Sequence, residues 1–155
     1  MLKNPPLNDI TEEEYRAFIS KNSHKYLRKF KKFWTGDTET FAIAWHWPAF
    51  LAGFWWLLYR KLYIWALAYL ILMTIPYVNF FIWIACPMVA HYLYYKHAKG
   101  KILAFKASPA SADILKTLSE RGGVHRWVPF AAVLSTVIAF IMFILGSILS
   151  LAATG

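Results

Sequence analysis

Three long stretches of this 155-residue chain contain no Asp, Glu, Lys or Arg: residues 41–59, 62–95 and 127–155. Only 16% of all residues are charged and 59% are apolar, whereas a soluble domain has roughly a quarter of its residues charged. A helix of about 20 apolar residues matches the thickness of the hydrocarbon core of a bilayer. The pattern therefore predicts an all-α, small polytopic membrane protein.

The positive charge indicates how the chain threads the membrane. The net charge of +9 falls into three basic clusters, within residues 16–32, at Arg60 and Lys61, and within residues 96–126. Positively charged loops stay on the cytoplasmic side. Four spans place the first and third clusters on opposite faces, whereas three spans place all of them on one face. We therefore expect three transmembrane helices, with the N-terminus in the cytoplasm and the C-terminus outside.

This topology divides the chain into five parts. They are a cytoplasmic amphipathic arm, an interfacial or re-entrant segment, a transmembrane hairpin, a basic cytoplasmic loop with a short helix, and a C-terminal transmembrane helix, at residues 1–40, 41–56, 57–95, 96–126 and 127–155. The polar opening of the chain is not typical of a secretory signal peptide, so we expect none.

Residues 41–56 are rich in tryptophan, whose indole ring is enriched in the headgroup layer of membranes. A straight helix from Pro48 would carry Arg60 and Lys61 about 18 Å along its axis. That depth lies well inside a hydrocarbon core of about 30 Å, where buried cations are costly. We therefore expect this segment to lie in the interface or to dip in and return. The first two spans are then expected at 57–75 and 80–95, although a crossing by 41–59 stays open.

The arm is predicted to form one basic amphipathic helix. Thr11 and Glu14 fit a capping box at its start. Apolar side chains then recur on one face at 100° per residue, opposite a basic face. The apolar face consists of Tyr15, Phe18, Ile19, Tyr26, Phe30 and Phe33.

A second short helix is predicted in the basic loop. Ser108 and Pro109 are typical of a helix start, and Gly122 with Gly123 is typical of a helix end. The apolar side of this helix is expected to rest on the membrane or on the arm. It consists of Ile114, Leu115 and Leu118.

Several of these segments together resemble a known family. They are Phe18–Asn22, Tyr26–Lys29, Trp45–Phe50, and Phe54–Lys61 with Tyr63. Over most of residues 15–100 they resemble the bacterial membrane proteins of domain-of-unknown-function family 2628, most distinctively in the stretch from Leu57 to Lys61. His46 departs from the asparagine expected in that pattern. The resemblance implies a small bacterial inner-membrane protein and implies no catalytic residues.

Basic side chains are the main candidates for function. Each Lys or Arg close to an anionic membrane surface contributes on the order of 1 kcal/mol of attraction. The candidates for contact with anionic lipid headgroups or a partner protein are Lys21, Lys25, Arg28, Lys29, Lys32, Arg60, Lys61, Lys96, Lys99 and Lys101. The alternative is that these charges only orient the chain during insertion. On the last span, Gly146 and Ser150 form a small-residue face that suits packing against a partner helix or a second copy.

Other classes of function find little support in the sequence. Cys86 and His91 are five residues apart and do not share a helix face, even if His46 approaches them, so neither a metal nor a cofactor is expected. Motifs of nucleophilic, zinc-dependent and nucleotide-dependent enzymes are missing, as are nucleic-acid-binding modules. We expect a non-enzymatic accessory or scaffold component of the bacterial inner membrane. The alternative is a subunit of an oligomeric channel or transporter.

Overall fold

The computed structural model describes residues 10–35, 38–107 and 113–154. Within them the chain forms seven α-helices, α1 (Glu12–Ile19), α2 (Ser23–Phe30), α3 (Trp47–Tyr59), α4 (Tyr63–Met73), α5 (Val78–Lys106), α6 (Ile114–Arg121) and α7 (Val128–Thr154). A 3₁₀ turn, η1 (Lys31–Phe33), precedes two short antiparallel strands, β1 (Trp34–Thr35) and β2 (Thr38–Glu39). The architecture is helical, as predicted, apart from this small ladder.

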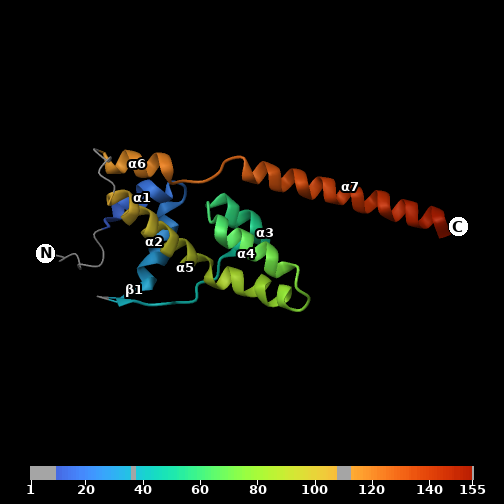
Figure 1. Ribbon diagram of the computed structural model, residues 1–155, viewed down its shortest axis with the longest axis horizontal. Coiled ribbons are helices and arrows are strands. Elements are labelled where there is room, and N and C mark those ends of the chain that lie inside the picture. Colours follow the sequence, from blue (N-terminus) through green and yellow to red (C-terminus); the bar gives the residue numbers. More distant parts are fainter. Residues whose placement is uncertain (1–9, 36–37, 108–112, 155) are drawn as a thin grey trace.

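The helices form a charged end and an apolar end of the molecule, and Figure 1 shows how they are arranged. α1, α2, α6 and the second half of α5 gather at one end, and they carry most of the charged side chains. α3, α4 and the first half of α5 lie beside them and contain no Asp, Glu, Lys or Arg. α7 projects away as a separate rod. Apart from α7, the charge-free helices are therefore grouped in space.

The arm forms two helices, so the prediction of a single helix is wrong. α1 begins at the predicted capping box, where Glu14 N donates to Thr11 Oγ1 over 3.2 Å. The helix breaks at Ser20 and Asn22, whose φ angles are 58° and 63°, and asparagine is among the residues that tolerate this conformation. The break lets α1 and α2 both pack on α5. The whole predicted apolar face is buried in that packing: Tyr15, Phe18, Ile19, Tyr26, Phe30 and Phe33.

The first predicted span, residues 57–75, is also wrong, because the chain reverses within it. Leu62 N donates to Leu57 O over 2.9 Å. Lys61 N donates to Leu58 O over 3.0 Å, and Lys61 has a φ of 62°. These bonds form a Schellman motif, which ends α3 and starts α4 in the opposite direction. The two helices have 13 and 11 residues, so they extend only about 20 and 16 Å.

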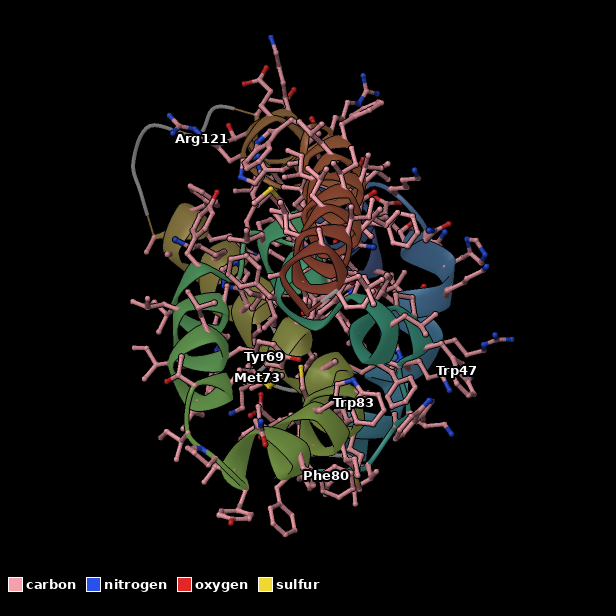
Figure 2. The ribbon with its side chains drawn as sticks, turned by 90° about the vertical axis from the view of Figure 1, so that its right-hand side faces the viewer. Trp47, Tyr69, Met73, Phe80, Trp83 and Arg121 are labelled. Atoms are coloured by element: carbon pink, nitrogen blue, oxygen red, sulfur yellow. The ribbon has the colours of Figure 1, made fainter. Side chains whose placement is uncertain are left out.

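The α3–α4 hairpin is closed by a kink in α3. Gly53 has a φ of 20°, and a Cβ atom there would lie 2.5 Å from Tyr69 Oη of α4. Figure 2 shows Tyr69 on the inner side of α4, whereas Trp47 and Phe80 lie at the periphery. Trp47 is 64% exposed and Phe80 is 57% exposed. The absence of a side chain at Gly53 therefore lets Tyr69 of α4 pack closely against α3.

The predicted interfacial segment, 41–56, begins as an extended stretch along α5. The backbone N–H groups of Ala44 and His46 donate to carbonyls of Met88 and Pro87 over 3.3 and 3.0 Å. Every second side chain of this stretch is exposed, namely Phe41, Ile43 and Trp45. The segment then enters α3 at Trp47.

In the described part of the chain, two helices are long and apolar enough to cross a membrane, α5 and α7. The predicted second and third spans, 80–95 and 127–153, fall almost wholly on them. α5 is covered by α3, α4, α1 and α2, whereas most of the large side chains of α7 are exposed. Length and composition therefore support two of the three predicted crossings.

α6 rests on α1, which is one of the two positions predicted for it. Its N-cap is Asp113, whose carboxylate accepts from Lys116 N over 3.2 Å; the predicted start at Ser108 and Pro109 lies outside the described residues. The predicted stop is confirmed, because α6 ends immediately before Gly122. A Cβ atom on Gly122 would overlap the backbone of Phe18, so this glycine permits the close contact with α1.

Candidate functional site

Arg60 joins the charged end of the molecule to the hairpin. Its side chain is only 2% exposed. Nη1 donates to Ile19 O and Tyr94 Oη, each over 3.2 Å, and Nη2 donates to Lys21 O over 3.1 Å. The guanidinium also lies 4.2 Å from the centre of the Tyr26 ring. Because Ile19 ends α1, the cation meets the negative end of the helix dipole. Arg60 was predicted to contact lipid or a partner protein, but Nη1 and Nη2 donate to internal carbonyls and to the Tyr94 hydroxyl.

Lys61 likewise donates hydrogen bonds to carbonyls at the C-terminal end of α6. Its Nζ donates to Arg121 O over 3.0 Å and to Gly122 O, at the end of that helix. Burial lowers the pKa of Lys61. The α3–α4 turn therefore binds the C-terminal ends of two helices, α1 through Arg60 and α6 through Lys61.

A cavity of about 600 Å³ lies beside this turn, and we call it the interfacial cavity. Its basic side chains come from three places in the chain: Arg60 and Lys61 in the turn, Lys101 on α5 and Arg121 on α6. Its apolar and aromatic wall is formed by Phe18, Leu62, Tyr63, Ile64, Trp65 and Phe105. The cavity thus combines cations with an apolar wall at the boundary between the two ends of the molecule.

The first turn of α4 forms part of this wall. Leu62 is the N-cap residue of α4 and provides no side-chain hydrogen bond. The first N–H groups of a helix have no partners within the helix and carry the positive end of its dipole. They therefore add to the positive potential of Lys101 and Arg121, which are both exposed. The arrangement suits an anionic group attached to an apolar body.

The other predicted basic residues divide into two groups. Lys96 and Lys99 both pair with Glu39 of β2, Lys96 over 2.7 Å, and these bonds lower the pKa of Glu39 to about 2. The second group lies on the outer side of the arm. It consists of the exposed Lys21, Lys25, Arg28 and Lys32 and the half-buried Lys29. Of the ten predicted residues, Arg60, Lys61 and Lys101 line the interfacial cavity.

Buried His46 has a structural role. His46 Nδ1 accepts from Ala49 N over 3.1 Å and so caps α3. The neutral ring then carries its proton on Nε2, which lies 3.0 Å from Tyr26 Oη. Burial, followed by the neighbouring His91, lowers the pKa of His46 to about 3. Among the described residues, no group of three or more His, Cys, Asp or Glu is placed to hold a metal.

Sequence reasoning missed Arg121 and the Tyr63–Trp65 turn. No local signal connects them, because they meet only when the hairpin turn docks against α6 through Lys61. Gly146 and Ser150, predicted to pack against another helix, lie on the exposed face of α7. A Cβ atom on Gly146 would have no neighbouring atom within 4 Å, so the packing partner stays a prediction.

Comparisons with known proteins add nothing to these observations, since no family model, curated protein or solved structure matches the chain. The resemblance to family 2628 therefore remains an expectation.

Proposed function

We propose that this is a non-enzymatic protein of the bacterial inner membrane that binds anionic phospholipid headgroups on the cytoplasmic face. The observation that carries the proposal is the interfacial cavity, where Lys101 and Arg121 line the same space as an aromatic wall. As a scaffold or accessory component, the protein would hold its charged end against the membrane through this lipid.

The proposed membrane position follows from the two ends of the molecule. α7 has 27 residues and extends about 40 Å, enough to span a hydrocarbon core of about 30 Å. The other helix of sufficient length, α5, is covered by neighbouring helices, and its first half would enter the cytoplasmic leaflet together with α3 and α4 as a shallow wedge rather than cross. The extended stretch at 40–46 favours a shallow position, because unpaired backbone groups are costly in hydrocarbon. Its outward aromatic side chains suit the headgroup layer.

The placement of the cations favours lipid binding over a role in insertion alone. Cations that only orient the chain need no particular arrangement. Here Lys101 and Arg121, from different helices, converge on one cavity beside the first turn of α4. A phosphate group offers several strong acceptors for such a cluster, and the aromatic wall suits the glycerol and upper acyl region of the same molecule.

Binding of short-chain lipids by the detergent-solubilised protein tests this proposal. The wild type is expected to bind dioctanoyl phosphatidylglycerol more tightly than dioctanoyl phosphatidylcholine. The double variant Lys101→Gln, Arg121→Gln should lose about 10- to 30-fold in affinity for the anionic lipid, since each charge contributes on the order of 1 kcal/mol. Intrinsic tryptophan fluorescence measures the binding.

A matched control is the double variant Lys25→Gln, Arg28→Gln, which removes two exposed cations of α2 that do not line the interfacial cavity. Its affinity should stay within about twofold of the wild type, because exposed charges outside the contact are screened by salt. Equal loss in both double variants, or equal binding of the two lipids by the wild type, would reject the cavity as the headgroup site.

The orientation has its own test. In a Cys86→Ser background, Ala153→Cys near the end of α7 should react with a membrane-impermeant maleimide added to the outside of intact spheroplasts. Lys25→Cys on α2 should react only after permeabilisation. The reverse pattern would contradict a cytoplasmic charged end.

A further inference from the structure

A second cavity adjoins the first one. It is an apolar groove of about 140 Å³ between α4 and α5, called here the α4–α5 groove. From α4 it is lined by Trp65, Ala68 and Leu72, and from α5 by Ala85, Cys86 and Val89. Trp65 also lines the interfacial cavity. The two cavities therefore share Trp65, in the first turn of α4, as a common wall.

The groove has a basic end and an apolar end, as suits an amphiphilic ligand. It starts at Trp65, close to the basic side chains, and continues along α4 into the half of the molecule that lacks charged residues. Tyr69, which also lines it, lies on the inner side of α4 in Figure 2. Ala85 and Trp65 are exposed, so the groove opens to the surface at these residues. In the proposed membrane position, a lipid chain in the bilayer would have lateral access to the groove.

We infer that the α4–α5 groove holds one acyl chain of the same anionic glycerophospholipid whose phosphate binds in the interfacial cavity. This inference rests on the proposed function and specifies its ligand. Charge complementarity exists at one end of the groove alone, which fixes the direction of the ligand: headgroup beside Lys101 and Arg121, chain toward Leu72. The small side chain of Ala68 helps to leave this space open.

Filling the groove tests the inference. Ala68→Phe places a ring in the groove, whereas Ala52→Phe makes the same change at an exposed position of α3 outside it. Binding of dioctanoyl phosphatidylglycerol is compared with binding of its deacylated headgroup, glycerophosphoglycerol. The wild type and Ala52→Phe should bind the lipid at least about 100-fold more tightly than the headgroup, since each buried methylene adds about fourfold. Ala68→Phe should lose at least tenfold in lipid affinity and keep its headgroup affinity within twofold.

The outcomes separate the inference from the proposed function. If Ala68→Phe is folded by circular dichroism and binds the lipid like the wild type, the groove is empty of acyl chain while the headgroup site stands. If the wild type does not prefer phosphatidylglycerol to phosphatidylcholine, the proposed function itself fails. Should Ala68→Phe not fold, Ala85→Leu narrows the groove from its exposed edge and is held to the same criteria.

A direct measurement locates the chain in the intact protein. Phosphatidylglycerol with brominated acyl chains, dilute in phosphatidylcholine vesicles, should quench Trp65, and Trp65→Phe should remove that part of the quenching. Equal quenching by brominated phosphatidylcholine at the same dilution would overturn the inference, because the groove would then hold any chain of the surrounding bilayer.

Discussion

Arg60 and Lys61 differ from Lys101 and Arg121, although all four line the interfacial cavity. The first pair donates to main-chain carbonyls at the ends of α1 and α6. The second pair is exposed at the edge of the cavity. The first pair of cations thus stabilises the contacts between the helices that line the cavity, whereas the second pair faces outward. Burial and available carbonyls, rather than charge itself, separate the structural cations from those that a ligand can use.

The largest effect on stability is expected from removing Arg60, the buried cation. Arg60→Ala leaves the carbonyls of Ile19 and Lys21 and the hydroxyl of Tyr94 without their donor. The free energy of unfolding should fall by about 3–5 kcal/mol, because each buried acceptor that loses its donor costs about 1–3 kcal/mol. Unfolding by SDS in mixed micelles, followed by tryptophan fluorescence, measures the change.

Arg121→Gln is the counterpart on the exposed side. It should change the free energy of unfolding by less than about 0.5 kcal/mol, as surface substitutions usually do. A loss from Arg121→Gln as large as that from Arg60→Ala would remove the distinction between the two pairs.

A smaller effect is expected at Glu39, which pairs with Lys96 and Lys99. Because the folded-state pKa of Glu39 is depressed to about 2, its contribution is present above the unfolded pKa of roughly 4.3 and disappears as the pH falls toward 2. Glu39→Gln should therefore cost about 0.5–1 kcal/mol at pH 7, the range for partly exposed ion pairs. Unfolding of both proteins at several pH values measures this.

The difference between Glu39→Gln and the wild type should shrink steadily between pH 5 and pH 2. A difference that stays constant over this range would mean that the Glu39 carboxylate does not contribute through its charge.

The features that could be predicted from the sequence are those with local causes. The Thr11–Glu14 capping box and the stop at Gly122 each depend on residues a few positions apart. The reversal at Lys61 was missed because a lysine occupies a position where glycine is the usual signal. Residues 57–75 are equally apolar whether they form one helix or two, so composition alone does not distinguish a crossing from a hairpin.

The residue types of the candidate site could be predicted from the sequence, but their arrangement could not. Basic residues were predicted to contact anionic lipid or a partner protein, and of these Lys101 lines the cavity as an exposed cation. The internal role of Arg60 depends on carbonyls of Ile19 and Lys21, about forty positions earlier in the chain. Those carbonyls become available only because the arm breaks at Ser20 and Asn22, a break that the continuous amphipathic pattern concealed.

The central claim, that Lys101 and Arg121 form an anionic-lipid site, is tested most directly by native mass spectrometry. The protein is released from nanodiscs that contain equal amounts of phosphatidylglycerol and phosphatidylcholine. The wild type should retain phosphatidylglycerol in clear excess, and the Lys101→Gln, Arg121→Gln variant should retain the two lipids about equally. Retention of both lipids in equal amounts by the wild type, or an undiminished excess in the variant, would contradict the account.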